Sequence, residues 1–385
     1  MEFWLKWVFW LSVLAVSFVT VGYPMVLALV APFIRRRRYV DDEVRSVSLI
    51  IAAYNEEACI ARKLENALAL KYPRERLEII VASDGSTDRT DEIVQSFSGR
   101  GVILRRFPRI GKTGMQNQMA KTASGQILVF SDANGFYHPD AIHKLVRNFA
   151  DPAVACVSGQ LVYEADIQSA GDSEHSYWRY EKYLKQRESD LSSLIGANGS
   201  IYAVRRADYV EIANDLISDL VEPLALVRRG RRVVYESEAF SAEEASATYA
   251  VEFRRKVRIL TRSIHGLVHM RALLNPFRYG IFSFQLFVHK FLRYMVPAFL
   301  LTGFGSLALL AATGHYFVPF LLAVVAFGFA TFVGRGTRAH RKSQIFRACH
   351  LLYYYLLVNY AMVLAWINVF RGRPVTIWVP ERKEA

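Results

Sequence analysis

Charged residues are missing from three long stretches of this 385-residue sequence. No Lys, Arg, Asp or Glu occurs in residues 7–34, 294–334 or 348–370. A helix needs about 20 predominantly apolar residues to cross a bilayer, and buried core helices rarely run so far without a charge. We therefore expect one membrane span in the first stretch and one in the last. The middle stretch should hold two spans, hinged near Gly314 and His315.

The first apolar stretch does not resemble a cleaved signal peptide. It is longer than the roughly 7–15 residues of a signal-peptide core, and the arginines 35–38 follow it directly. Basic residues stay on the cytoplasmic side, so this cluster and the basic loop 335–347 should both face the cytoplasm. The sequence thus predicts a multi-pass protein of the cell membrane with a cytoplasmic middle region. Basic residues follow residues 348–370, so this last segment either crosses the bilayer or lies in its interface.

Cysteine is scarce, and features of nucleic-acid binding are missing. The three cysteines, Cys59, Cys156 and Cys349, have no spacing typical of a metal site or a disulfide framework, so we expect reduced, structural thiols. No zinc-finger or basic-zipper spacing accompanies the net charge of +13. Most of that charge lies beside the apolar stretches, which suits anionic membrane lipids and argues against a nucleic-acid partner.

The chain divides into four expected regions, without internal repeats or low-complexity segments. They are an N-terminal transmembrane anchor (1–38), a cytosolic domain (39–262), an interfacial region (263–292), and C-terminal transmembrane helices with a tail (293–385). The interfacial region mixes aromatic with basic residues, a composition typical of an amphipathic helix in the headgroup plane.

Strands and helices alternate in the cytosolic domain. Short apolar runs at 47–53, 77–82, 102–104 and 126–130 predict strands. Between the first two, apolar residues recur over 60–68 at the spacing of an amphipathic helix. This alternation predicts an α/β fold with a mainly parallel sheet, whose ligands bind at the carboxyl ends of the strands.

Polar groups follow the first two expected strands. Tyr54 and Glu56 come after the first, and Asp84 begins an Asp-Gly-Ser turn after the second. An aromatic face beside carboxylates is suited to stacking a base and holding a ribose. Each motif alone also fits an ordinary turn or a helix cap.

Two further groups are suited to phosphate chemistry. Lys112 stands where a helix is expected to begin and is placed to meet a diphosphate, although a solvated lysine is the alternative. Asp132 and Asn134 follow the fourth expected strand, and their oxygens are the hard donors that Mg²⁺ or Mn²⁺ prefers. A plain Asp/Asn turn at the strand end is the competing interpretation.

The order of these motifs resembles the membrane-bound family-2 glycosyltransferases, which include polysaccharide synthases and enzymes that glycosylate lipids. The resemblance covers about residues 46–262 and implies a GT-A-type, Rossmann-like catalytic domain followed by a helical transmembrane bundle. It also implies that the uridine, the diphosphate and the metal are held by the residues that match here, Tyr54, Glu56, Asp84, Lys112, Asp132 and Asn134. Asn134 replaces the family's second aspartate, a change that weakens this metal ligand.

The resemblance continues into the expected acceptor and base positions. Asn198, Gly199 and Ser200 match a loop and helix start that line the acceptor site, although a strand-to-turn connection fits the same residues. Asp219 matches the family's general base, and Ser218 replaces the glutamate that precedes it. An N-cap role for Asp219 is the structural alternative.

The family's final motif, Gln-x-x-Arg-Trp, is altered. Arg258 matches its arginine, Arg255 replaces the glutamine and Ile259 replaces the tryptophan. The extra cation of Arg255 is a plausible compensation for Asn134, because both act on the diphosphate charge. Losing the tryptophan removes a stacking platform for a growing glycan. A basic amphipathic helix in the membrane interface is the alternative interpretation of residues 254–262.

The sequence as a whole predicts an inverting, metal-dependent membrane glycosyltransferase. Its donor would be a UDP-sugar, its acceptor a lipid or a lipid-linked or other glycan, and its metal Mg²⁺ or Mn²⁺. One alternative is a processive polysaccharide synthase. A second is a non-catalytic membrane scaffold with a nucleotide-sugar fold, suggested by the altered motifs.

Overall fold

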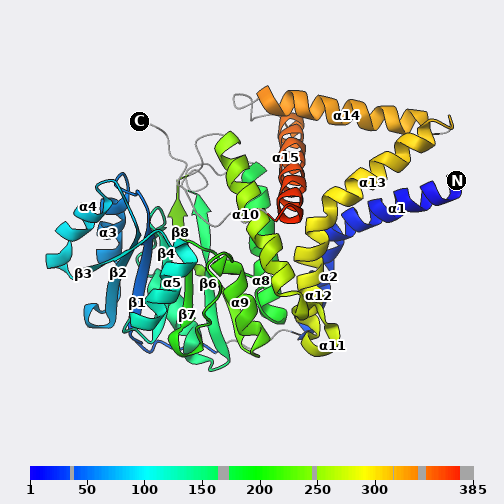
Figure 1. Ribbon diagram of the computed structural model, residues 1–385. Helices are drawn as coiled ribbons and strands as arrows, with labels where there is room; N and C mark the ends of the chain where they lie inside the picture. Colours follow the sequence, from blue (N-terminus) through cyan, green and yellow to red (C-terminus); the bar gives the residue numbers. More distant parts are fainter. Residues whose placement is uncertain (35–38, 164–172, 245–248, 315, 337–343, 373–385) are drawn as a thin grey trace.

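The computed structural model describes the chain except for residues 35–38, 164–172, 245–248, 315, 337–343 and 373–385 (Figure 1). The arginine cluster at 35–38, His315 and most of the basic loop 335–347 therefore lie outside the described residues.

One mixed sheet of eight strands forms the centre of the domain expected at residues 39–262, in the order β3-β2-β1-β4-β7-β6-β8-β5. The four strands expected from the sequence pair with one another in parallel, as predicted. They are β1 (Val47–Ala53), β2 (Leu77–Asp84), β3 (Val102–Phe107) and β4 (Ile127–Asp132). The others are β5 (Phe136–Tyr137), β6 (Val154–Tyr163), β7 (Ile201–Arg205) and β8 (Arg232–Glu243), with β7 antiparallel to both β4 and β6.

Helices cover both faces of this sheet, which explains the unbroken apolar runs in its strands. Leu49 and Ile51 pack in one core with α3 (Ile60–Leu68), α4 (Thr90–Ser96) and α6 (Ala141–Val146). Ile50, between them, belongs to the opposite core. That core contains residues of α5 (Gly111–Thr122), α9 (Ser218–Arg228) and α10 (Tyr249–His269).

Two local expectations are wrong. The loop 198–200 runs into strand β7 and starts no helix, because the following apolar residues pair between β4 and β6. Asp219 is not an N-cap residue, since α9 begins at Ser218 and its N-cap is Ile217.

Three helical stretches are long and apolar enough to cross a membrane among the residues described: Glu2–Ile34, Ile281–Ala311 and Ala348–Phe370. The first comprises α1 (Glu2–Ser17), a π-helical turn and α2 (Tyr23–Ile34); the second comprises α12 (Ile281–Leu286), another π-helical stretch and α13 (Arg293–Ala311). The third lies in α15 (Gln344–Phe370). The apolar part of α14 (Phe317–Gly336), the remaining expected span, is a shorter helix, Phe317–Val333.

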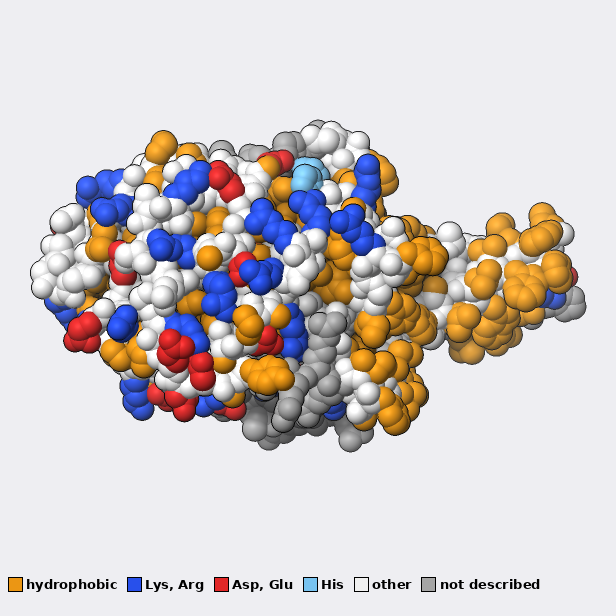
Figure 2. All heavy atoms as spheres, turned by 90° about the horizontal axis from the view of Figure 1, so that it is seen from below, with side chains coloured by type: hydrophobic (Ala, Val, Ile, Leu, Met, Phe, Trp, Pro, Cys, Tyr) orange, Lys and Arg blue, Asp and Glu red, His pale blue; other side chains and the backbone are white. Residues whose placement is uncertain are grey.

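The candidate membrane-spanning helices differ in their surface from the domain that contains the sheet. Helices α1 and α13 lie side by side and project away from the sheet (Figure 1). The end of the molecule that carries them is covered with hydrophobic side chains, whereas the catalytic domain shows a mixture of acidic, basic and apolar groups (Figure 2). This distribution is consistent with a lipid environment for the projecting helices.

The expected interfacial region, 263–292, is not one helix. Its first residues complete α10, a short helix α11 (Pro276–Tyr279) follows, and its last residues continue through α12 into α13. Phe277 is fully exposed, whereas Phe282 and Leu286 are buried.

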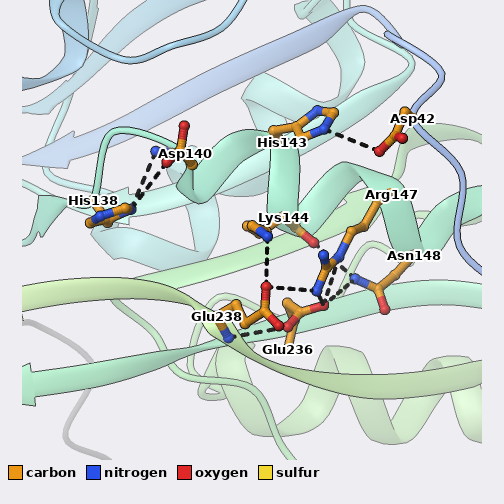
Figure 3. Close-up of polar contacts among 9 residues, drawn as sticks. All are labelled: Asp42, His138, Asp140, His143, Lys144, Arg147, Asn148, Glu236 and Glu238. Carbon is orange, nitrogen blue, oxygen red and sulfur yellow. Dashed lines mark hydrogen bonds and ion pairs between the residues drawn. The ribbon is translucent and has the colours of Figure 1, made fainter.

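Separate sets of polar contacts attach residues 41–42 and strand β8 to α6 and the turn that follows it (Figure 3). The backbone N–H of Asp41 donates to the carbonyl of Arg147, and His143 lies 3.4 Å from the carboxylate of Asp42. Arg147 also pairs with the buried Glu236 and with Glu238 on β8. These contacts attach residues 41 and 42, which precede β1, to the rest of the domain.

Candidate active site

The first part of the site joins the ends of β1 and β2 to the start of α5. The guanidinium of Arg109 lies 3.2 Å from the centre of the Tyr54 ring and pairs with Asp84. The buried Asp84 carboxylate also accepts hydrogen bonds from the backbone N–H groups of Ile110 (2.8 Å) and Gly111 (3.0 Å). Tyr54 and Asp84, singled out from the sequence, thus lie in one cluster, and Arg109 is a member that sequence reasoning missed.

Glu56 is held in the loop behind this cluster. Its side chain is buried, its backbone N–H donates to the Thr90 hydroxyl at 2.7 Å, and its carboxylate accepts from the Cys59 thiol at 3.2 Å. These contacts place Glu56 in the packing between the two loops.

The second part of the site brings residues from four separate elements together. The Lys112 amine, in the first turn of α5, donates to the Asp132 carboxylate at the end of β4 and to the carbonyl of Gly199 at 2.9 Å. A Cβ atom built on Gly199 would lie 2.6 Å from Oδ2 of Asp219 and 3.3 Å from Nζ of Lys112. The absent side chain of Gly199 therefore lets Asp219 and Lys112 approach the same loop.

The neighbouring residues of this loop are held by hydrogen bonds. The Asn198 side chain accepts from both the N–H and the hydroxyl of Ser200 at 3.2 Å, and the Asn198 N–H donates to Ser158 at 2.9 Å. The carbonyl of Ser200 accepts from the buried Tyr137 hydroxyl. The loop is thereby fixed against β5 and β6.

Asp219 lies in the first turn of α9 in an electrostatic setting suited to a base. Burial raises the pKa of its carboxyl above the ordinary value, whereas the cations Lys112 and Arg262 lower it and Asp132 raises it. A carboxylate with a raised pKa is a better proton acceptor than an ordinary aspartate, provided that it remains ionised.

Three arginines share one face of α10. Arg255, Arg258 and Arg262 are spaced three and four residues apart, so they follow one another along the helix. Arg255 lies 3.8 Å from Glu243, and Arg262 donates to the carbonyl of Leu216 at 2.9 Å. The half-buried Arg258 lies between them in sequence. The spacing was the signal that could have identified Arg262.

The loop after β4 is the candidate metal site. Asp132 and Asn134 are partly exposed there, and their carboxylate and amide oxygens fit a hard divalent cation such as Mg²⁺ or Mn²⁺. Among the described residues, no group of three or more His, Cys, Asp or Glu side chains is placed to hold a metal ion. Protein ligands alone therefore form a sparse site, as is common for a cation that also binds substrate phosphates.

Two buried charged residues near this loop were missed from the sequence. Lys63 on α3 is fully buried, donates to the carbonyl of Gly135 and lies 4.2 Å from the centre of the Tyr137 ring. Burial lowers the pKa of Lys63 to about 7, and the carboxylates of Asp132 and Glu243 oppose this shift.

Glu243, at the end of β8, is the other missed residue. Burial raises the pKa of its carboxyl, the nearby Asp132 adds to the rise, and Arg255 opposes it. The position of Lys63 on the apolar stripe of α3 was a signal for that residue, whereas nothing in the sequence distinguished Glu243 from its exposed neighbour Glu244.

Comparison with known proteins agrees with this architecture. Residues 48–212 match the family model described as glycosyl transferase family 2. The poly-beta-1,6-N-acetyl-D-glucosamine synthase of Staphylococcus aureus is 26% identical over 225 residues, which cover 56% of this chain and 54% of that protein. The match thus spans about half the length of that relative. The probable glycosyltransferase YdaM of Bacillus subtilis is 34% identical over 110 residues, 27% of this chain and 26% of that one.

A solved structure shares the fold over nearly the whole chain. It is a mannosyltransferase from Pyrobaculum calidifontis in complex with GDP-Man and Mn²⁺, similar at a TM-score of 0.71 and 19% identity over 95% of this chain and 99% of that one. This likeness identifies the fold as GT-A, as the sequence predicted.

Proposed function

We propose that this chain, which carries a family 2 glycosyltransferase domain, is a glycosyltransferase that uses a UDP-sugar as its donor. Its acceptor is a lipid, a lipid-linked glycan or another glycan, and it acts at the cytoplasmic face of the cell membrane. The observation that carries the proposal is the meeting of Lys112, Asp132 and Asp219 around the loop at Gly199. The residue roles below follow the family resemblance and this geometry.

In the proposed reaction, the acceptor hydroxyl attacks the anomeric carbon from the side opposite the leaving diphosphate. Asp219 takes the hydroxyl proton as the new carbon–oxygen bond forms, and the bond to the diphosphate breaks with inversion. Lys112, Arg255 and Arg258 stabilise the charge of the departing diphosphate. Tyr54 and Asp84 hold the uridine, Glu56 orders their loop, and Asn198, Gly199 and Ser200 border the acceptor.

A divalent cation belongs to this proposal. Asp132 and Asn134 would hold it, and when bound it would offset negative charge on the diphosphate. Both Mg²⁺ and Mn²⁺ suit oxygen donors of this kind. The similar structure from Pyrobaculum calidifontis contains Mn²⁺.

Replacing the proposed base tests this assignment. Asp219→Asn should lower transfer by about 10²–10⁴-fold, because the amide cannot accept the proton, and should leave UDP binding nearly intact. The measurements are turnover of labelled UDP-sugar and calorimetric titration with UDP. Asp91→Asn, at a carboxylate paired with the exposed Arg106, is the matched control and should transfer normally. Undiminished turnover in Asp219→Asn would exclude the base role.

A processive polysaccharide synthase is the second candidate, because the Staphylococcus aureus relative is a poly-N-acetylglucosamine synthase. The exposed Ile259 at the position of the family's tryptophan favours a single transfer. Sizing the product made with limiting donor separates the two candidates: a processive enzyme makes a few long chains, whereas a single-transfer enzyme adds one sugar to many acceptors.

A further inference from the structure

We propose that Glu243 supplies the second carboxylate of the divalent-cation site, in place of the charge that is missing at Asn134. This inference rests on the proposed function, since it concerns the same cation. It differs from that proposal by adding a ligand from β8, more than a hundred positions beyond the loop that carries Asp132 and Asn134.

Strand register places Glu243 at the metal loop. In the antiparallel pair of β5 and β8, Tyr137 lies opposite Ser241 and Phe136 opposite Ala242. Continuing the same register by one residue sets Glu243 opposite Gly135, which directly follows Asn134 in the chain. Residues opposite one another in such a pair lie about 5 Å apart at Cβ, so a glutamate there is within reach of the loop.

Close packing holds the loop against β8. A Cβ atom on Gly135 would lie 2.8 Å from the Ser241 hydroxyl oxygen, so no larger residue fits there without a shift. The buried Lys63 amine holds the Gly135 carbonyl from the other side. The distance between Glu243 and the loop is therefore set by packing on both sides.

The burial of Glu243 calls for a cation. Its side chain is 2% exposed, and its Oε2 atom has no hydrogen-bond partner among the described residues. The Ser200 side chain is a hydrogen-bond partner of the Glu243 carboxylate. Nη2 of Arg255 lies 3.8 Å from Oε2, which is too long for a hydrogen bond. A buried carboxylate is costly unless it is paired and hydrogen-bonded or coordinates a metal.

Charge balance points the same way. Asp132 and the neutral amide of Asn134 together offer a dication only one negative charge, whereas Glu243 would bring the total to two. Divalent cations of this kind are commonly held by one or two carboxylates together with substrate phosphates. Asp132 and Glu243 would then form a pair of carboxylates, the first at the end of β4 and the second at the end of β8.

The inference is tested by titrating the full-length protein in detergent with Mn²⁺ alone and measuring the bound metal by electron paramagnetic resonance. Glu243→Gln should weaken binding by at least about 10-fold, because it removes a charged ligand and keeps the size of the side chain. Glu243→Asp should bind better than Glu243→Gln. Asn134→Asp in the Glu243→Gln background should restore affinity, which also shows that the variant is folded.

Two controls separate the alternatives. Glu238→Gln changes the same residue type on the same strand, at an exposed carboxylate paired with Lys144 and Arg147 (Figure 3), and should bind Mn²⁺ like the wild type. Arg255→Met should not weaken Mn²⁺ binding, because it removes a like charge. If Glu243 serves only to position Arg255, Glu243→Gln will bind Mn²⁺ as the wild type does, and the inference is overturned.

Titration of the wild-type protein with Mn²⁺ distinguishes failure of the Glu243 inference from failure of the proposed function. Equal binding by wild type and Glu243→Gln removes Glu243 from the site and leaves the metal-dependent reaction intact. A wild type that binds no Mn²⁺ and transfers sugar in the presence of a chelator would overturn both the metal part of the proposed function and the role of Glu243.

Discussion

Gly199 is the residue on which the geometry of the site depends most directly. It offers its carbonyl to Lys112, and its missing side chain leaves room for the Asp219 carboxylate. No positive backbone φ is involved, so the requirement at this position is one of space. A single methyl group there would separate the groups that we assign to proton transfer and to leaving-group stabilisation.

Gly199→Ala should therefore lower transfer by about 100-fold, since displacing a reacting group by about 1 Å costs on that order. Gly99→Ala is the matched control, because a Cβ atom there meets nothing within 4 Å. Turnover and the thermal unfolding of both variants should be measured together. A Gly199→Ala variant with normal turnover would contradict the close approach of Asp219 to this loop.

The pH dependence of transfer reports on Asp219. Burial raises the pKa of this carboxyl above its ordinary 3.8, and the base must be ionised to accept a proton. Activity should thus be complete above the raised pKa and should fall as the pH drops through it, at a higher pH than for an ordinary aspartate.

Arg262→Gln sharpens this test, because Arg262 lowers the pKa of Asp219. The acid limb of the kcat/KM profile should move to higher pH in this variant. Arg89→Gln, at an exposed arginine paired with Glu92, should leave the profile in place. An acid limb that does not move would separate Arg262 from the proposed base.

At the scale of helices and strands, a buried polar cluster joins α2, near the N-terminus, to α8. The fully buried Glu188 of α8 (Ser173–Leu191) accepts a hydrogen bond from the Tyr23 hydroxyl of α2 at 2.6 Å. The same carboxylate oxygen lies 2.6 Å from Nδ1 of His289. Arg293 pairs in turn with Glu181, on the same α8 helix. The cluster ties two candidate membrane spans to α8.

Tyr23→Phe removes one hydrogen bond from this cluster and should destabilise the protein by about 1–3 kcal/mol, because a buried carboxylate loses a partner. The measurement is thermal unfolding in detergent, with Tyr39→Phe, at an exposed tyrosine, as the control. Equal unfolding temperatures for Tyr23→Phe and the wild type would show that Glu188 does not depend on the anchor.

The elements differ in how well the sequence predicted them. The four parallel strands were predictable because burial on both faces leaves a continuous apolar run, as in Val47–Ala53. Strand β7 was not, because its direction depends on pairing with β4 and β6 across long intervals of sequence. Glu243 was missed for the same reason: only the register of β8 against β5 brings it to the loop that we propose as the metal site.

At the scale of the whole molecule, α15, which contains the last candidate membrane span, packs on α10, the helix that carries the arginines that we assign to the diphosphate. Helix α15 lies along α10 (Figure 1). The rings of Phe253 and Tyr360 stack there with their centres 5.6 Å apart. The Tyr354 hydroxyl donates a hydrogen bond of 3.0 Å to the Glu252 carboxylate. The indole of Trp366 donates to the carbonyl of Tyr294 in α13. The sequence predicted the apolar segments by composition, but their partners depend on tertiary packing, which composition does not specify.

The proposed cytoplasmic location of residues 39–262 makes a prediction about membrane topology. If the catalytic domain is cytoplasmic, protease added to inverted membrane vesicles should digest residues 39–262, and protease added outside intact spheroplasts should not. Alkaline carbonate should leave the protein in the membrane fraction, because the apolar helices hold it there. Digestion from outside intact spheroplasts would contradict the proposed orientation.

The most direct measurement of the account's central claim is product formation by the purified protein in lipid. The protein is incubated with labelled UDP-sugars and Mn²⁺ or Mg²⁺, and the products are extracted with organic solvent; Asp219→Asn is the matched control. For a lipid or lipid-linked acceptor, the account predicts label in the organic phase, and this label should depend on the metal and on Asp219. Label confined to an insoluble polymer would contradict the lipid acceptor, and no incorporation from any UDP-sugar would contradict the proposed donor.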